Sequence, residues 1–260
     1  MKGKGDHLTT EPQKPISDIR KEAQRVANAM DLVKVPARLI GGVAIWLRCP
    51  SAEHELLRRE YMDLDFLGLS SRTTEIKHFL VGLGYQADKY FNSLHGRSRL
   101  LFHDNENDRQ VDVLFDEMNM CHKLDFRSRI NVNEHTLPIA DLLLTKLQIV
   151  EVNPKDMTDL FTLFSDHPIG DEDGEMINGR YIAQLTSGNW GLYRTIQLNL
   201  DRVIERAAAL PQVGPFVIER QVHALRDMIE SEPKSVKWKV RARLGDRVPW
   251  YELPEEVRRS

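Results

Sequence analysis

Two short segments in which acidic and apolar residues alternate constrain this chain more than any other feature. Aspartates stand at positions 63 and 65 within residues 62–67 (MDLDFL), and Asp112 stands within residues 110–115 (QVDVLF). Alternation with a period of two is typical of a strand, whose successive side chains point to opposite faces. Asp63 and Asp65 therefore share one face, and Asp112 joins them if the two strands are neighbours.

Carboxylates crowded on one face repel each other and are costly to desolvate. Such a strand usually holds a cation between them or leaves them in water. Mg²⁺, and similarly Mn²⁺, prefers hard oxygen ligands and completes its shell with phosphate and water oxygens. The sequence therefore predicts a Mg²⁺ or Mn²⁺ site at Asp63, Asp65 and Asp112. The alternatives are an acidic strand edge in solvent and a calcium-type loop.

A pair of glycines precedes the first acidic segment. Residues 37–40 (ARLI) are typical of a short strand, and a helix is expected from Val43, so Gly41 and Gly42 form a strand-to-helix turn. Backbone N–H groups in such a turn approach a phosphate closely, and the helix N-terminus favours negative charge. A phosphate site is the functional interpretation, and a plain tight turn is the alternative.

This order of a glycine pair, an Asp-Leu-Asp strand and a distant third aspartate resembles the active-site signature of the DNA polymerase β nucleotidyltransferase superfamily. Downstream, residues 139–147 (IADLLLTKL) and 155–160 (KDMTDL) resemble the abortive-infection nucleotidyltransferases, which are the toxins of type IV toxin-antitoxin systems. The resemblance covers about residues 35–165 and rests on the order of motifs.

The resemblance implies two overlapping sets of site residues. The catalytic residues would be Asp63, Asp65, Asp112 and Lys146, with the three aspartates as metal ligands. The nucleotide-binding residues would be Gly41, Gly42, Arg59, Lys146 and Asp159. Lys146 also has a plainer interpretation, because a lysine in an apolar helix is often a surface residue whose stem covers its neighbours.

The chain matches the family pattern at some positions and departs from it at others. Arg59 matches an arginine often found four residues before the first acid. Gly42 stands where many relatives have serine, and Tyr61 stands where they have a small hydroxyl residue. No arginine precedes the Lys155–Asp156 pair in the way that the family pattern expects.

The implied activity is transfer of a nucleoside monophosphate from a nucleoside triphosphate to a hydroxyl group. For a toxin-like enzyme the acceptor would be tRNA, another RNA or a protein, and the partners would include a cognate antitoxin. Two other interpretations stay open. One is a small-molecule nucleotidyltransferase of the aminoglycoside type, and the other is a catalytically inactive binding protein with the same fold, because a fold does not determine the acceptor.

Length and cysteine usage are consistent with such an enzyme. The 260 residues, 41% of them hydrophobic, suffice for one large or two smaller domains. The two cysteines, Cys49 and Cys121, provide neither a disulfide framework nor zinc spacing, so we expect both to be reduced and structural. No signal-peptide core or membrane-length apolar stretch is present, which predicts no membrane partner and a cytoplasmic location.

The expected fold class is α/β (α+β): a nucleotidyltransferase-type mixed sheet with flanking helices, followed by a helical C-terminal domain. The expected divisions are a flexible tail (1–15), the α/β domain (16–135) and the helical domain (136–260). In the α/β domain we expect a helix over 18–30 capped by Ser17, followed later by a loop over 49–59. A second helix should run from Ser71 or Thr73 to Leu83, where Gly84 ends it. Strands around 100–102 and 111–115 should form a hairpin. In the helical domain we expect helices over 139–151, 155–165, 178–186, 190–209, 214–231 and 235–244, with an acidic loop over 170–179.

Basic residues gather near the C-terminal end. Residues 1–179 hold 22 Lys and Arg against 29 Asp and Glu, whereas residues 180–260 hold 14 against 10. The basic segment 234–247 also carries an apolar stripe and interleaved tryptophans: Val236, Val240, Leu244, Trp238 and, just beyond it, Trp250. The segment is either an RNA-binding surface or a surface helix that packs its stripe on the core.

Overall fold

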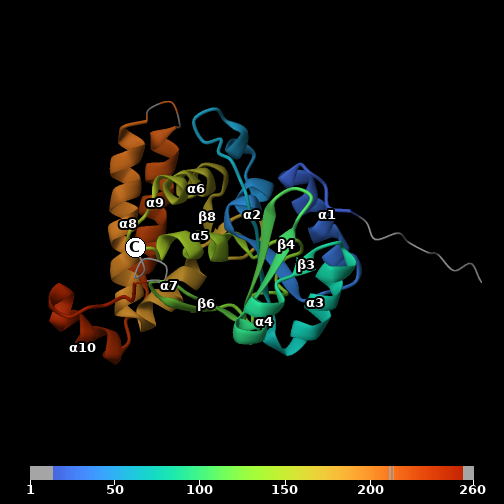
Figure 1. Cartoon of the computed structure of the whole chain (residues 1–260). Helices are drawn as coiled ribbons and strands as arrows, with labels where there is room; N and C mark the ends of the chain where they lie inside the picture. The colour runs from blue at the N-terminus through green and yellow to red at the C-terminus, as the bar shows by residue number, and fades with distance from the viewer. Residues whose placement is uncertain (1–13, 211, 213, 254–260) are drawn as a thin grey trace, which may run out of the picture.

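A five-stranded mixed sheet forms the centre of the N-terminal half (Figure 1). The computed structural model describes residues 14–210, 212 and 214–253, so the expected tail lies almost wholly outside the described residues. The strands, in their order across the sheet, are β1 (Ala37–Ile40), β2 (Leu64–Gly68), β5 (Arg109–Phe115), β4 (Arg99–Asp104) and β3 (Gln86–Ala87).

The two acidic strands are neighbours, which meets the condition for Asp112 to join the other acids. β2 and β5 run parallel, and their register places Asp65 directly beside Asp112. The other pairs in the sheet are antiparallel, including the predicted hairpin of β4 and β5. A short second hairpin of β6 (Glu117–Asn119) and β7 (Lys123–Asp125), which the sequence analysis did not predict, follows β5 and leads towards the helical half.

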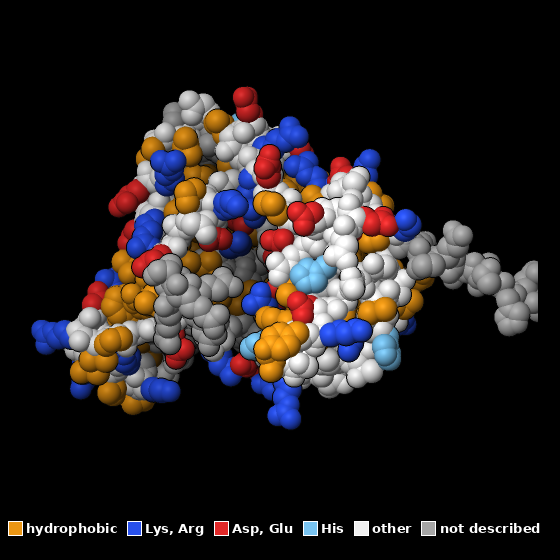
Figure 2. All heavy atoms as spheres, viewed as in Figure 1, with side chains coloured by type: hydrophobic (Ala, Val, Ile, Leu, Met, Phe, Trp, Pro, Cys, Tyr) orange, Lys and Arg blue, Asp and Glu red, His pale blue; other side chains and the backbone are white. Residues whose placement is uncertain are grey.

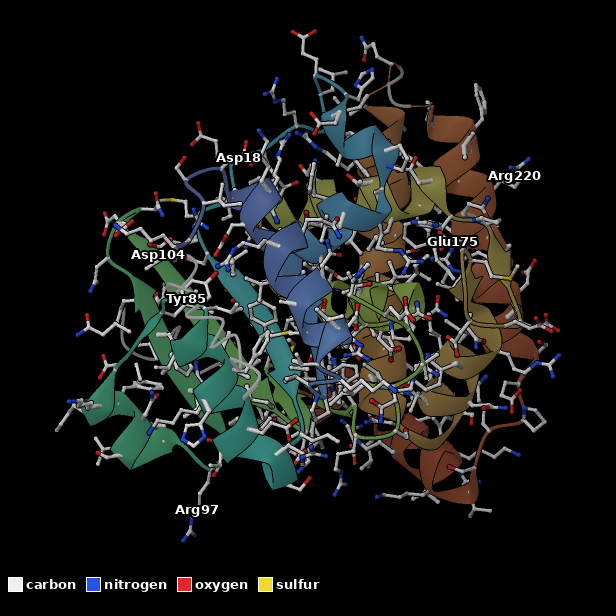
Figure 3. The ribbon with its side chains drawn as sticks, turned by 90° about the vertical axis from the view of Figure 1, so that its right-hand side faces the viewer. Asp18, Tyr85, Arg97, Asp104, Glu175 and Arg220 are labelled. Carbon is white, nitrogen blue, oxygen red and sulfur yellow. The ribbon has the colours of Figure 1, made fainter. Side chains whose placement is uncertain are left out.

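Four helices accompany the sheet: α1 (Ile19–Leu32), α2 (Gly41–Arg48), α3 (Thr73–Gly82) and α4 (Lys89–His95). The expected Ser17 cap of the first helix is wrong. Asp18 is the N-cap, and its carboxylate accepts hydrogen bonds from the amides of Arg20 and Lys21 at 2.9 and 3.1 Å (Figure 3). A short 3₁₀ turn, η1 (Pro50–Glu53), lies within the expected loop over 49–59.

All six helices predicted for the second half are present, and their ends fall within four residues of the expected ones. They are α5 (Ile139–Leu147), α6 (Pro154–Asp166), α7 (Gly179–Gly188), α8 (Trp190–Ala208), α9 (Pro215–Ser231) and α10 (Val236–Leu244). The strands β8 (Ile169–Gly170) and β9 (Ile177–Asn178) pair in parallel and close the base of the acidic loop. The mixed sheet with flanking helices and the helical C-terminal region are therefore confirmed.

One continuous apolar core runs from Ala23 in α1 to Ile229 in α9. Helix α5 lies at its centre, where it contacts α2, α6, α7 and α8, and nearly all of its side chains are buried. The division at residue 135 stays a prediction, because the core continues across it. Cys49 and Cys121 are buried and unbridged. Among the helices of the described residues, none has the length and apolar character that crossing a bilayer requires.

The exposure of helix α10 contradicts the interpretation in which the apolar stripe of the basic segment packs on the core. Val236, Val240 and Leu244 are 78%, 56% and 48% exposed, so the expectation that this stripe packs on the core is wrong. Trp238 instead packs on the ring of Tyr193 in α8, with ring centroids 5.1 Å apart. Hydrophobic and basic side chains consequently alternate on the surface of the protruding α10, at the lower left of Figure 2.

Candidate active site

The glycine pair lies where the first strand passes directly into a helix. β1 ends at Ile40 and α2 begins at Gly41, two residues earlier than expected. Gly41 has a φ of +70°, and a Cβ there would lie 2.6 Å from Oδ2 of Asp65. Glycine is required at this position both for the left-handed backbone and for the close approach of the carboxylate. Asp65 therefore lies against the N-terminus of α2.

The three predicted acids occupy unequal positions around this helix N-terminus. Asp65 and Asp112 are side by side on β2 and β5. Asp63 immediately precedes β2 and is exposed, so the expectation that all three acids lie on strands holds only for Asp65 and Asp112. The strand begins one residue too late to fix the Asp63 side chain by sheet pairing.

The carboxyl group of Asp65 has a raised pKa. Burial, together with the neighbouring carboxylates of Asp112 and Asp63, raises the pKa of Asp65 to about 6. Lys146 and Arg99 act in the opposite direction on this pKa. Burial and the adjacent carboxylates therefore both disfavour the charged form of Asp65.

Arg99 on β4 is a site residue that the sequence analysis missed. Its Nε donates to Oδ1 and Oδ2 of Asp112 at 2.7 and 2.9 Å, and its Nη2 also donates to Asp112. The β4–β5 register pairs Leu101 with Asp112, so Arg99 lies diagonally across from Asp112 on the same face. Counting back from the predicted hairpin tip would have located Arg99, provided that the register was known.

The described residues contain no group of three or more His, Cys, Asp or Glu side chains arranged to hold a metal ion. Asp112 is held by Arg99 instead, in a bidentate pair that uses both of its oxygens. The predicted ligation of Mg²⁺ by Asp63, Asp65 and Asp112 stays a prediction.

A second group of charged residues lies over Gly42. Nε and Nη2 of Arg59 donate to the two carboxylate oxygens of Asp159, each at 2.9 Å. A Cβ on Gly42 would lie only 1.6 Å from Nη2 of Arg59, so the absence of a side chain there makes room for the guanidinium. Tyr61 covers Arg59, with the guanidinium carbon 4.6 Å from the ring centroid.

Lys146 on α5 joins this group from the helical half. Its Nζ lies 2.7 Å from Oδ1 of Asp156 and 2.9 Å from Oδ2 of Asp159, both on α6. Burial opposes its charge, but Asp159 and Asp156 outweigh that effect and raise the pKa of Lys146. Its side chain is only 13% exposed, so the surface-lysine interpretation is wrong.

The structure thus brings all of the predicted site residues to one region around the start of α2. The sequence analysis did not foresee that Arg59 and Asp159 bind each other, or that Asp156 shares Lys146 with Asp159. Asp65 and Asp112 come from the sheet, and Arg59 and Lys146 meet the α6 carboxylates Asp159 and Asp156. The region thus combines carboxylates that can bind a cation with basic groups that can face a polyanion.

Comparisons with known proteins give limited information. No model of a known protein family matches the chain, and no curated protein matches it in sequence. Structures that resemble it include the lincosamide antibiotic adenylyltransferase LnuA bound to lincomycin, at 16% identity over 55% of this chain and 94% of that chain, with a TM-score of 0.38. A protein from H. pylori provisionally designated a nucleotidyltransferase has 13% identity, coverages of 83% and 98%, and a TM-score of 0.39. JHP933 from Helicobacter pylori has 13% identity, coverages of 88% and 97%, and a TM-score of 0.39. Likenesses of this strength carry no inference about activity.

Proposed function

We propose that this protein is a metal-dependent nucleotidyltransferase that moves a nucleoside monophosphate from a nucleoside triphosphate to a hydroxyl group. The observation that carries the proposal is the register of Asp65 beside Asp112, next to the glycine N-terminus of α2. Two carboxylates beside a helix N-terminus combine a cation site with a phosphate site. Nucleotidyl transfer requires both.

The carboxylate chemistry fits a divalent cation. Burial and, after it, the carboxylates of Asp112 and Asp63 raise the pKa of Asp65, and a bound cation would favour its charged form. Asp63, Asp65 and Asp112 would hold Mg²⁺, or Mn²⁺ in its place, with Asp112 released from Arg99. When bound, the ion supplies positive charge that lowers the pKa of the acceptor hydroxyl and stabilises the attacking and leaving oxygens.

The residues of the chain itself bind and orient the reactants. The amides of Gly41 and Gly42 face the β- and γ-phosphates, where the helix dipole favours negative charge. Arg59 over Gly42, and Lys146, which shares Asp159 with it, are the basic groups that would contact the phosphates. The acceptor oxygen attacks the α-phosphorus, its proton passes to the carboxylate of Asp112, and the bond to the pyrophosphate oxygen breaks.

The proposed acceptor is RNA, with tRNA as the first candidate. The exposed basic and apolar surface of α10 supports this choice, because phosphate contacts by Lys and Arg dominate nucleic-acid binding. A protein acceptor, a small-molecule acceptor and the inactive binding protein are the competing outcomes. A toxin role and a cognate antitoxin belong to the proposal only if RNA or a protein proves to be the acceptor.

Label transfer tests the proposal. Purified protein is incubated with Mg²⁺ and each α-labelled nucleoside triphosphate, separately with total RNA, with a protein extract and with aminoglycosides. The proposal expects label on RNA with the wild-type protein and none with Asp65→Asn. Label on protein or on an aminoglycoside would show that the acceptor is that molecule and not RNA. The absence of transfer together with the absence of nucleotide binding would favour the inactive binding protein.

A further inference from the structure

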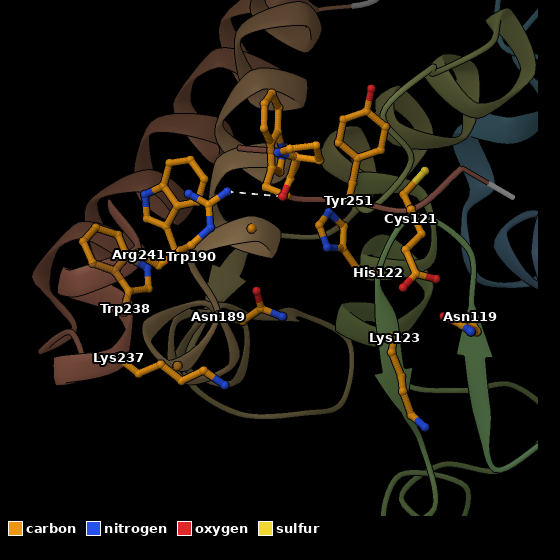
Figure 4. A pocket seen from close by; sticks show the side chains of 15 residues that line it. Asn119, Cys121, His122, Lys123, Asn189, Trp190, Lys237, Trp238, Arg241 and Tyr251 are labelled. Atoms are coloured by element: carbon orange, nitrogen blue, oxygen red, sulfur yellow. Dashed lines mark hydrogen bonds between the residues drawn. The ribbon is translucent and has the colours of Figure 1, made fainter. Parts of the chain in front are cut away.

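A second concave site lies away from the carboxylates, between the β6–β7 turn, the start of α8, α10 and residues 249–252 (Figure 4). The cavity has a volume of about 660 Å³, within the usual range for small-ligand sites. Its lining shares no residue with the candidate active site. Six of its fifteen lining residues are tryptophan, lysine or arginine: Trp190, Trp238, Trp250, Lys123, Lys237 and Arg241.

The aromatic part of the wall presents several flat surfaces close together. The rings of Trp190 and Trp250 meet edge to face with centroids 6.2 Å apart, and Tyr251 lies 5.3 Å from Trp250. The guanidinium carbon of Arg241 lies 4.3 Å from the centroid of Trp190. Such surfaces stack with planar ring systems, and they do so for any nucleobase.

Trp250 is held in place by an inner layer of polar contacts. Its Nε1 donates to Oγ1 of Thr195 at 3.1 Å, and that hydroxyl lies 2.8 Å from Nε2 of His122. Burial lowers the pKa of His122 to about 4, so its ring is neutral where it meets this hydroxyl. The carbonyl of Trp250 sits so close to α8 that a Cβ on Gly191 would lie 2.5 Å from it. The aromatic wall is therefore built into the fold.

Electrostatics at the cavity favour an anion. Lys123, Lys237 and Arg241 line it against one acid, Glu252, although Lys123 also pairs with Glu117 at 2.7 Å. The N-terminus of the 19-residue α8 opens at the same place, where Asn189 caps the amide of Leu192.

One polar group in the wall has no partner. Nε1 of Trp238 is buried and makes no hydrogen bond within the described part of the chain. A buried donor without an acceptor destabilises the fold, so a ligand acceptor at this position would satisfy it. Trp238 also lines the cavity, between Lys237 and the Arg241–Trp190 stack (Figure 4).

We propose that this cavity is a second nucleotide-binding site, which stacks a base on Trp250 and Tyr251 and holds a phosphate near Lys237 and the N-terminus of α8. Trp238 donates its N–H to the nucleotide. The nucleotide is either free or a unit of single-stranded RNA, since both present the same base and phosphate. Asn119 in the lining is seven residues after Asp112, so their Cα atoms lie within roughly 25 Å of each other.

Tryptophan fluorescence measures this binding directly. Three of the four tryptophans line the cavity, and a Trp46→Phe background removes the fourth. AMP, adenosine, ribose 5-phosphate and a short oligoadenylate are titrated into this protein. The proposal expects quenching by AMP or by the oligoadenylate, and much weaker binding of adenosine and of ribose 5-phosphate, because each lacks one half of the recognised unit.

Two conservative variants and one matched control locate the binding. Lys237→Ala removes one charge, and Trp238→Phe removes the unpaired donor but keeps a ring against Tyr193; each should weaken binding about fivefold, as expected for one partly exposed polar contact. Lys239→Ala, on the same helix but outside the cavity lining, should leave binding unchanged. Asp65→Asn should also leave it unchanged, so the cavity is tested independently of the proposed catalysis.

The outcomes separate the two sources of the nucleotide. If AMP and the oligoadenylate bind with equal affinity, the cavity is a site for a free nucleotide. If only the oligoadenylate binds, the cavity is a site for an RNA strand. Equal weakening by Lys239→Ala, loss of quenching in Asp65→Asn, or no quenching by either probe would overturn the proposal.

Discussion

Arg59 and Asp159, separated by 100 residues in sequence, are joined by two hydrogen bonds of 2.9 Å between the guanidinium and the carboxylate. The pair connects the segment before the acidic strand to α6 in the helical half. It also fixes the guanidinium above Gly42, where a side chain would displace it. The two halves of the candidate site are therefore positioned relative to each other by a buried bidentate ion pair.

Removing the carboxylate of this pair should lower the stability of the fold. Asp159→Ala leaves Arg59 buried without its partner and removes one of the two carboxylates at Lys146. We expect the free energy of unfolding to fall by about 3 kcal/mol, since breaking a buried pair leaves an uncompensated charge. Urea unfolding monitored by circular dichroism measures the change. As a control, Asp171→Ala breaks the pair with Arg180, in which both side chains are more than half exposed, and should cost under about 1 kcal/mol. Equal effects of the two variants would contradict this account.

Gly42→Ala should damage catalysis more than stability. The added methyl group would lie 1.6 Å from Nη2 of Arg59, so the guanidinium must move away from the N-terminus of α2. We expect the transfer rate to fall roughly a hundredfold, the order expected when a positioning group is displaced by about 1 Å. Gly82→Ala is the matched control, because a Cβ there meets nothing within 4 Å and the residue lies in α3. Full activity of the Gly42→Ala enzyme would show that the position of Arg59 does not matter for the reaction.

Arg99 should compete with the metal ion for Asp112. Because the guanidinium occupies both oxygens of Asp112, a cation can bind there only after Arg99 withdraws. Arg99→Gln should therefore lower the Mg²⁺ concentration for half-maximal transfer by about fivefold, as expected when one charged competitor is removed. Arg97→Gln, whose side chain points away from the protein in Figure 3, is the control. An unchanged Mg²⁺ requirement in Arg99→Gln would contradict competition at Asp112.

The buried His122 should make stability depend on pH. Its pKa is about 4 in the folded protein against 6.5 ordinarily, because burial disfavours the charged ring. The unfolded chain takes up this proton first as the pH falls, so the stability contributed above pH 6.5 is lost between pH 6.5 and about 4, by up to about 3 kcal/mol. His122→Asn lacks this contribution, so the difference in unfolding free energy between wild type and variant should narrow over that range.

The comparison with His122→Asn is needed because other groups titrate nearby. The pKa of Asp65 and that of Asp141 are each raised to about 6 by burial, and raised carboxyl pKa values make stability increase as the pH falls. Those contributions are common to both proteins and cancel in the difference. A constant difference between pH 7 and pH 4 would show that His122 is not buried in the neutral form.

Local patterns predicted most of the elements and the central contact of the site. The alternation around Asp65 and Asp112 predicts two strands, and the structure confirms that they are neighbours. The strand-to-helix glycines are confirmed in the same way, because a single residue with positive φ suffices to require glycine at position 41. Ser17 and Asp18 are both good helix caps, and local pattern alone does not separate them.

Contacts between distant segments could not be predicted in this way. Finding Arg99 requires the register of the β4–β5 hairpin, and the Arg59–Asp159 pair requires the placement of α6 against the sheet half. The second cavity is formed by segments around residues 121, 190 and 250, which only tertiary packing brings together. The sequence indicated Trp238 and Trp250 as interleaved aromatics, but not that they share one wall.

The most direct test of the central claim compares labels on the transferred group. Wild-type protein, Asp65→Asn and the surface control Asp125→Asn are each given Mg²⁺, acceptor RNA, and nucleoside triphosphate labelled either at the α- or at the γ-phosphate. The account predicts that the wild type and Asp125→Asn transfer the α-label, that the γ-label leaves as pyrophosphate, and that Asp65→Asn transfers neither. Transfer of the γ-label, or full transfer of the α-label by Asp65→Asn, would contradict nucleotidyl transfer at this site.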